Sequence, residues 1–231
     1  MTKENILFII IGLLGGVIIG FVFANSVNQK GTVPIAGAMM QNANMPAGHP
    51  EVPGGGSGST APEIQAAIEK AKSEPDNFEA QLKAAELYYQ IQRFEGSIEF
   101  LKRANQLRPE SREVIVHLGN AHFDSGKYED AEKWYSAALA KKADDVDVRT
   151  DLGLTFIFRD KPDYDRAIAE FQKSLALDPN HPQTLQNLTV AYTKKGDAAK
   201  AKDTLTKLEV LSPTNESIKK LREDIDKIAA K

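Results

Sequence analysis

The stretch from Leu118 to Leu139 reads LGNAHFDSGKYEDAEKWYSAAL and contains the pattern that decides the fold. On both sides of Ser125-Gly126 the apolar side chains recur every three or four residues, which is the spacing of an amphipathic helix. Serine followed by glycine interrupts such a pattern and favours a turn. The stretch therefore predicts two amphipathic helices joined by a short turn.

The same arrangement returns along most of the chain. Proline ends the unit at Pro75, Pro109, Pro179 and Pro213, with Ala143 in the corresponding place, so the spacings are 34, 34, 36 and 34 residues. A small residue in the second helix and a ring late in the first keep the same rhythm. These markers are Ser97, Ala131, Ala167 and Ala201, and Tyr88, His122, Phe156 and Tyr192. A single helix pair cannot bury its apolar stripe alone, so we expect stacked pairs that share a continuous core.

Over about residues 62–231 the unit resembles the tetratricopeptide repeat, whose Leu-Gly pair is matched by Leu118-Gly119 and Leu152-Gly153. The resemblance implies an all-α solenoid of helix-turn-helix repeats. Some positions depart from the family pattern. The usual tryptophan is replaced by Gln81, Ile115, Arg149 and Leu185, the Leu-Gly pair by Ala84-Ala85 and Leu188-Thr189, and two extra residues lie around 159–163.

We expect about four repeats, a leading half-repeat and a terminal capping helix. The expected ranges are 62–77 for the half-repeat, 78–111, 112–145, 146–181 and 182–215 for the repeats, and 216–231 for the capping helix. Thr60 and Glu63 have the spacing of a capping box at the start of the first helix. In the last range Ile218, Leu221 and Ile225 share one face and charges cover the rest, as the end of a solenoid requires.

Residues 6–24 read ILFIIIGLLGGVIIGFVFA, with no charge. As a helix they would be about 28 Å long, close to the hydrocarbon thickness of a bilayer. We expect a transmembrane helix after a cytoplasmic tail at 1–5. The chain would then be a single-pass protein of the bacterial inner membrane, with its repeats in the periplasm. A signal peptide cleaved after Ala24 and a buried core helix are the alternatives.

Gly12, Gly16 and Gly20 would lie on one face of that helix, at the spacing that lets two membrane helices approach closely. A homodimer through this glycine face is one interpretation, and a membrane helix without a partner is the other.

Residues 25–61 are rich in Gly, Pro, Asn, Ser and Met and are expected to be a disordered, flexible linker. Within it lie Met39, Met40, Met45 and His49, whose sulfur and imidazole groups would suit Cu(I). The other interpretation is a Met-rich tract without metal, since nothing fixes the geometry of four ligands there. We assign no cofactor to the chain.

In the tetratricopeptide family the first helix of each repeat lines a groove that binds a peptide or protein partner. Carried over by position, the resemblance assigns to this groove Leu82, Glu86, Tyr89, Val116, Asn120, Phe123, Thr150, Leu154, Ile157, Phe158, Gln186, Val190 and Thr193. Several are apolar or aromatic, and the alternative is that some of them pack inward between helices. Leu82 and Glu86 replace the lysine and asparagine with which family members hold a carboxylate. The resemblance thus favours an extended or helical peptide with apolar anchors.

Composition and motifs narrow the class of function. A net charge of −3 without a concentrated basic face does not favour nucleic-acid binding. The absence of cysteine excludes disulfides, thiolate metal sites and covalent haem attachment. His117 and His122 are five residues apart and would lie on different helix faces, and no nucleophile, metal or phosphate-loop motif is present. We expect the chain not to be an enzyme.

These observations predict a membrane-anchored scaffold that binds another protein. An alternative is an accessory factor that holds apocytochromes during c-type cytochrome maturation, since the order of anchor, linker and repeats and the Pro46–Pro50 stretch resemble such proteins. A further alternative is a copper carrier that uses the Met and His residues of the linker.

Overall fold

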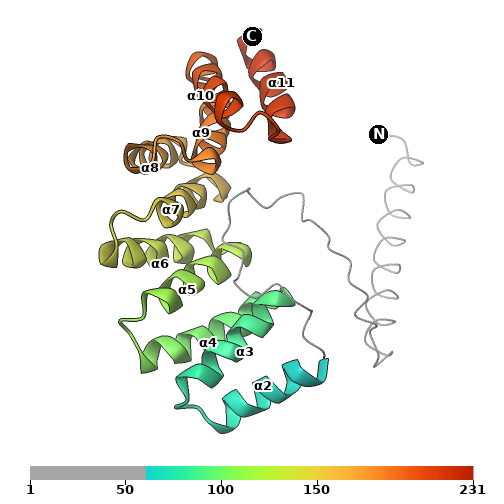
Figure 1. Ribbon diagram of the computed structural model, residues 1–231, viewed down its shortest axis with the longest axis vertical. Coiled ribbons are helices and arrows are strands. Elements are labelled where there is room, and N and C mark those ends of the chain that lie inside the picture. The colour runs from blue at the N-terminus through green and yellow to red at the C-terminus, as the bar shows by residue number, and fades with distance from the viewer. Residues whose placement is uncertain (1–60, 231) are drawn as a thin grey trace, which may run out of the picture. The chain divides into compact units, whose positions relative to one another are not determined.

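The computed structural model describes residues 61–230, which form ten α-helices and no strand (Figure 1). Helix α2 (Ala61–Ser73) comes first and α11 (Ser217–Ala229) last. Between them lie four pairs: α3 (Phe78–Gln90) with α4 (Phe94–Leu107), α5 (Arg112–Asp124) with α6 (Tyr128–Lys141), α7 (Val146–Phe158) with α8 (Tyr164–Leu177), and α9 (Pro182–Lys195) with α10 (Ala198–Leu211). We call these pairs repeats 1 to 4. The predicted all-α repeat solenoid is confirmed for the described residues.

The first helices of repeats 1 to 3 begin at a capping side chain, and that of repeat 4 begins at a proline. The side chains of Asn77, Ser111 and Asp145 accept hydrogen bonds from backbone N–H groups three residues further on. Such caps satisfy donors that a helix start leaves unpaired. The fourth first helix, α9, instead begins with Pro182, whose missing N–H costs nothing at this position.

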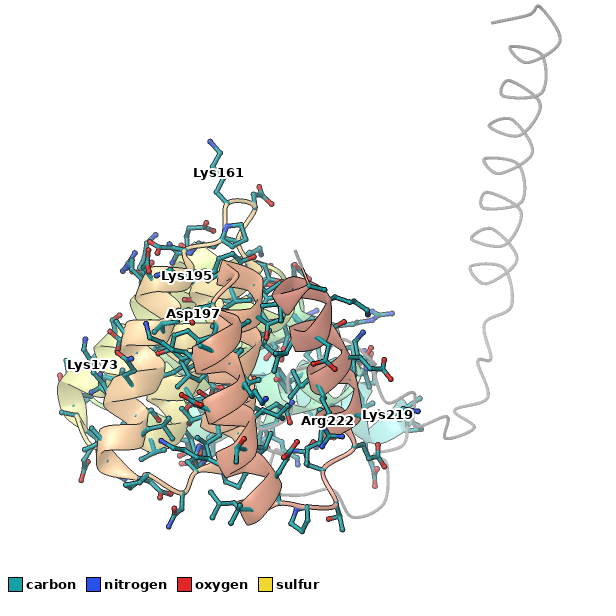
Figure 2. All side chains as sticks on the ribbon, turned by 90° about the horizontal axis from the view of Figure 1, so that it is seen from above. Lys161, Lys173, Lys195, Asp197, Lys219 and Arg222 are labelled. Atoms are coloured by element: carbon teal, nitrogen blue, oxygen red, sulfur yellow. The ribbon has the colours of Figure 1, made fainter. Side chains whose placement is uncertain are left out.

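The turn inside each repeat is closed by one recurring backbone hydrogen bond. It runs to the carbonyl of the ring residue late in the first helix, as in Lys127 N–H to His122 O at 2.8 Å. In repeat 3 the same bond joins Asp163 to Phe156 at 2.8 Å, across the longer connection 159–163. Lys161 projects from the tip of this connection (Figure 2). The two extra residues are therefore looped out without displacing either helix.

Three turns need a residue in the left-handed backbone region. Gly126 and Gly196 have φ of 76° and 86°, and Gln92 occupies the corresponding place in repeat 1 with φ of 57°. A side chain in this region costs free energy that glycine does not. The turn geometry is thus kept in repeat 1 in spite of its sequence.

The core forms between neighbouring helices along the whole stack. The predicted small residues Ala131, Ala167 and Ala201 have no exposed surface, which lets the second helices approach their neighbours closely. Phe156 and Tyr192, two of the predicted rings, are also buried. These core predictions are confirmed.

Both ends of the stack are covered by a single helix. Ile64 and Ile68 of α2 pack with Leu87 of α3. Helix α11 packs on α9 and α10 and buries Ile218 and Leu221, while its opposite face is charged. Each terminal helix covers an apolar face that a further repeat would otherwise cover.

Several predictions lie outside the described residues. They are the tail at 1–5, the membrane helix at 6–24 with Gly12, Gly16 and Gly20, and the linker predicted at 25–61 with its methionines and histidine at 39, 40, 45 and 49. Only the last linker residue, Ala61, is described, and it begins α2 instead. Between residues 61 and 230 the helices all fall short of the length and apolar content needed to cross a bilayer.

Candidate functional site

The first helices of the four repeats contact one another and form a common face, which we call the first-helix face. Tyr89 of α3 donates a hydrogen bond to Asp124 of α5. Phe123 of α5 packs against Phe158 of α7, and Thr150 of α7 bonds to Thr184 of α9 at 2.6 Å. These contacts place the first helices of consecutive repeats side by side.

The structure divides the predicted groove residues into two groups. Those left exposed or half-buried are Glu86, Tyr89, Val116, Ile157, Phe158, Gln186, Val190 and Thr193. Those buried between helices are Leu82, Asn120, Phe123, Thr150 and Leu154. The first group is available to a partner, whereas the second supports it from below.

Two of the buried residues make specific polar contacts. Asn120 Oδ1 accepts a hydrogen bond from the Tyr135 hydroxyl at 2.9 Å. The Thr150 hydroxyl lies 3.0 Å from that of Ser174 and 2.6 Å from that of Thr184, so it ties α7 to α8 and α9. These contacts hold neighbouring helices in register.

Three rings lie together where α5, α6 and α7 meet, and we call them the aromatic cluster. Phe123 meets Tyr128 edge to face at 5.2 Å between ring centroids and meets Phe158 likewise at 5.8 Å. Tyr128 stacks on Phe158 at 5.9 Å. Phe158 is 39% exposed although it is a large apolar residue. The cluster thus presents an aromatic surface on a rigid base.

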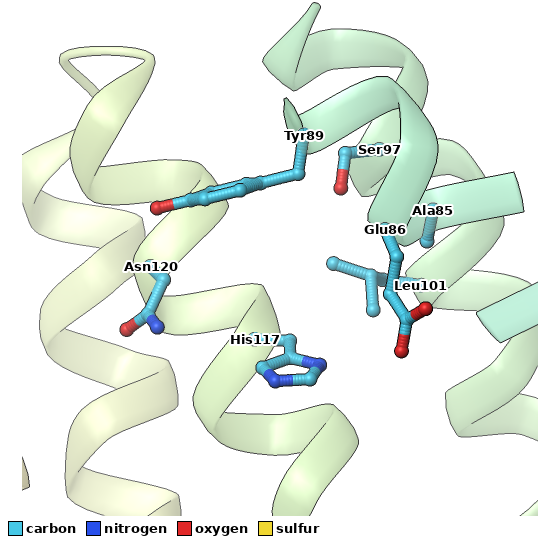
Figure 3. A pocket seen from close by; sticks show the side chains of 7 residues that line it. All are labelled: Ala85, Glu86, Tyr89, Ser97, Leu101, His117 and Asn120. Carbon is cyan, nitrogen blue, oxygen red and sulfur yellow. The ribbon is translucent and has the colours of Figure 1, made fainter. Parts of the chain in front are cut away.

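A narrow cavity, which we call the slot, opens between α3 and α5 (Figure 3). It has about 20 Å³ of space for the centre of a water molecule. Its lining is mostly apolar, with a carboxylate and an imidazole at the edge. The lining residues are Ala85, Glu86, Tyr89, Ser97, Leu101, His117 and Asn120.

The slot exists because repeat 1 has a smaller residue than repeats 2 and 3 at one position. Leu101 corresponds to Tyr135, 34 residues further along the chain, and to Phe171, a further 36 residues on. In repeat 2 the ring of Tyr135 fills the space beside Asn120 and is fully buried. Leucine is too short to fill the equivalent space in repeat 1.

The first-helix face carries carboxylates near the slot. Glu86 lines the slot and Asp124 accepts the Tyr89 hydroxyl. Burial, and then the neighbouring Asp124, raise the pKa of Tyr89, so this phenol stays neutral. Burial lowers the pKa of His117 despite the nearby carboxylates, so this imidazole is neutral at pH 7. The edge of the slot is therefore negatively charged.

Asp151 lies buried at the position of repeat 3 that corresponds to His117. It is 2% exposed, and its Oδ2 has no hydrogen-bond partner among the described residues. Burial and then the nearby Asp147 and Asp124 raise its pKa well above the usual value. This carboxyl therefore keeps its proton to higher pH than an exposed aspartic acid would.

Sequence reasoning overlooked most of the residues that form the slot. Of its lining only Glu86, Tyr89 and Asn120 are among the residues that the resemblance assigns to the groove, whereas Ala85, Ser97, Leu101 and His117 are not. The signal that could have found them is an alignment of the repeats with one another, because leucine at 101 stands where repeats 2 and 3 have rings.

A hydroxyl, an imidazole and a carboxylate form a chain of contacts between repeats 3 and 4. The Nδ1 of His181 lies 2.7 Å from the Thr184 hydroxyl, and its Nε2 lies 3.1 Å from Asp147. The side chain of Thr184 has no exposed surface, so its oxygen cannot reach a substrate. These residues join repeats 3 and 4. Residues 61–230 also contain no group of three or more His, Asp or Glu side chains arranged to hold a metal ion.

Comparison with known proteins gives matches over nearly all of the described chain. Family models described as "Tetratricopeptide repeat" match residues 61–112, 92–150 and 160–225. The photosystem I assembly protein Ycf3 of Prochlorococcus marinus (strain NATL2A) is 30% identical over 95 residues, which are 39% of this chain and 55% of that protein. The chain thus spans about half the length of this curated relative.

Solved structures similar to the repeat region include those of MamA and YrrB. MamA is 26% identical, with a TM-score of 0.59, over 65% of this chain and 81% of that one. YrrB, described as a TPR protein with an unusual peptide-binding site, is 17% identical, with a TM-score of 0.61, over 70% of this chain and 82% of that one. The likeness to YrrB concerns the fold alone.

Proposed function

The chain belongs to the tetratricopeptide-repeat family, and from this premise we propose that it is a scaffold that binds a segment of another protein along its first-helix face. The observation that carries the proposal is the row of incompletely buried apolar side chains on successive first helices. This row comprises Tyr89, Val116, Ile157, Phe158 and Val190. A partner lying across the row would cover the apolar surface that the core leaves open.

The aromatic cluster offers the strongest anchor in that row. Buried aromatic contacts contribute a large share of the energy at protein interfaces. Phe123 and Tyr128 hold the ring of Phe158 in place by edge-to-face and stacked contacts, so little conformational entropy would be lost on binding. An apolar or aromatic side chain of the partner would pack against the exposed part of Phe158.

The proposed role includes a membrane anchor. The uncharged run at 6–24 would hold the scaffold at a bilayer and the linker would let the repeats reach a partner near the surface. We place the repeats in the bacterial periplasm on the same sequence grounds. The name of one matching relative, an assembly protein, supports a scaffold that acts during the assembly of a complex. The apocytochrome and copper hypotheses stay predictions from the sequence.

Binding, not catalysis, is the proposed activity. Members of this repeat family generally act as scaffolds, and Thr184, the hydroxyl nearest to a catalytic arrangement, is inaccessible. The alternating charges on the second helices form exposed ion pairs such as Lys133 with Asp130, an ordinary solvated surface.

Site-directed photo-crosslinking tests this proposal. Benzoylphenylalanine would replace Phe158 or Val190 on the first-helix face, or Val210 on α10, which is 77% exposed. After illumination of cells that express the full chain, mass spectrometry would identify the adducts. We expect the same partner to be crosslinked from 158 and 190 and not from 210. Equal crosslinking from all three positions, or from 210 alone, would contradict the proposal.

A further inference from the structure

An unpaired polar atom lies at the inner end of the slot. Ser97 is 1% exposed, and its Oγ has no hydrogen-bond partner among the described residues. Figure 3 shows this oxygen turned toward the space between Tyr89 and Leu101. The corresponding residues of repeats 2 to 4 are alanines, at 131, 167 and 201. A buried hydroxyl without a hydrogen-bond partner is unfavourable unless a ligand or a water molecule forms a hydrogen bond with it.

The edge of the slot would attract a cation. Glu86 lines it, and among residues 61–230 this carboxylate forms an ion pair only with the exposed Lys83 of the same helix, at 3.8 Å. Glu113 and Glu86 both lie near enough to His117 to act on its charge. His117 itself is neutral at pH 7 because burial disfavours its charged form. A positive group at this edge would therefore meet carboxylates and no competing imidazolium.

The size of the slot selects among cations. Its 20 Å³ is room for about one water molecule. A lysine ammonium has about this size and three donors, whereas the planar guanidinium of arginine is larger. The apolar lining, including Leu101 and the ring of Tyr89, suits the methylene stem that carries an ammonium.

We propose that the slot binds the side chain of a lysine in the partner segment, with its ammonium between Glu86 and the Ser97 hydroxyl. This proposal rests on the proposed function and names the chemistry that the scaffold recognises. Lysine would take the place in repeat 1 that the Tyr135 ring takes in repeat 2. Charge complementarity thus adds specificity to the apolar contacts of the groove.

The aromatic cluster fixes a second feature of the partner. Asn120 lines the slot and Phe123 supports the exposed ring of Phe158, and the two are three residues apart on α5, so the slot and the aromatic cluster are neighbours along this helix. Neighbouring side chains on one face of an extended peptide are two residues apart. The partner would thus carry a lysine with an aromatic residue two positions away.

Binding of short synthetic peptides to the full chain tests the slot. The probe is acetyl-Gly-Lys-Ala-Phe-Gly-amide, compared with peptides that carry norleucine or arginine in place of lysine, with affinity measured by NMR titration. We expect both replacements to weaken binding about tenfold. Equal affinities of the three peptides would overturn the proposal.

Two variants separate the slot from the rest of the face. Ser97→Ala installs the residue of the other repeats. It should weaken binding of the lysine peptide but leave the affinity for the norleucine peptide unchanged. The pair Ala85→Gly with Leu101→Tyr copies repeat 2, fills the slot and should remove the preference for lysine. The matched control makes the corresponding change in repeat 4, Thr189→Gly with Leu205→Tyr. This control should retain the preference for the lysine peptide. Circular dichroism checks that each variant is folded.

The outcomes distinguish this proposal from the proposed function. Crosslinking from 158 and 190 combined with an unchanged lysine preference in the filled variant would overturn the slot but keep the scaffold. Absence of groove crosslinking would overturn the scaffold. Loss of lysine preference in the filled variant, with the repeat 4 control unaffected, supports both.

Discussion

The two central repeats and the two outer repeats differ in the pair of residues that packs the first helix of a repeat against its second helix. In repeats 2 and 3 a glycine faces a ring, Gly119 against Tyr135 and Gly153 against Phe171. A Cβ on Gly119 would lie 2.5 Å from Tyr135 Cε1, too close for any real contact. In repeats 1 and 4 the corresponding pairs are Ala85 with Leu101 and Thr189 with Leu205.

This difference explains why the family's Leu-Gly pair is absent from the outer repeats. Glycine is needed only where a ring on the second helix occupies the space of a Cβ. Once leucine replaces the ring, alanine or threonine fits at the glycine position. The substitution has a second consequence in repeat 1, because the shorter leucine leaves the slot open on the first-helix face.

The largest expected effect comes from breaking a central pair. Gly119→Ala should lower the free energy of unfolding by about 1–3 kcal/mol, because the new methyl group overlaps the ring of the fully buried Tyr135. Urea denaturation followed by circular dichroism measures the change. Adding Tyr135→Leu should recover part of the loss by copying repeat 1. If the two changes are simply additive, the pairing argument is wrong.

A smaller effect is expected at the turns. Gln92→Gly should raise the free energy of unfolding by about 1 kcal/mol, since glycine adopts the left-handed backbone of this turn without strain. Gly126→Ala in repeat 2 should lower it by a similar amount, and a Cβ there meets no neighbouring atom, so the backbone alone is tested. Urea denaturation of both variants provides the measurement, and opposite signs are the expected result.

The smallest expected effect is a dependence of stability on pH, and it comes from Asp151, the counterpart of His117 in repeat 3. Because burial raises the pKa of Asp151 in the folded state, the unfolded state loses this proton at lower pH. The contribution of Asp151 to the free energy of unfolding is thus largest below the pKa that this group has in the unfolded state. It declines as pH rises towards the pKa of the folded state. Asp151→Asn should stabilise the protein at pH 8 and much less at pH 4. Denaturant curves at the two pH values would show this, and a pH-independent difference would argue against it.

The helices and repeats could be predicted because they depend on local signals. The period of 34 to 36 residues, the cap at Ser111 and the turn glycines are visible in one sequence, and the structure has the expected helix pairs. The longer connection in repeat 3 was visible as well, although its closing bond from Asp163 to Phe156 was not. Such a bond depends on how the extra residues fold back.

The candidate site was harder to predict because position on a helix does not give burial. Phe123 and Phe158 were assigned to the same groove, yet Phe123 is only 6% exposed whereas Phe158 is 39% exposed. The neighbouring helices α6 and α7 make the difference, since Tyr128 and Phe158 cover Phe123. Exposure of a side chain is decided by residues distant in sequence.

The sequence by itself determined the all-α repeat class, the two covering helices and the small residues of the core, because periodicity and caps act within a few turns of helix. Only the tertiary structure decided how the repeats differ. The slot depends on Leu101, Ser97 and residues of α3 and α5 meeting in space, and none of these is distinctive alone. Whether a ring or an opening lies beneath the first-helix face follows from the fit between paired helices, since packed side chains must share one volume.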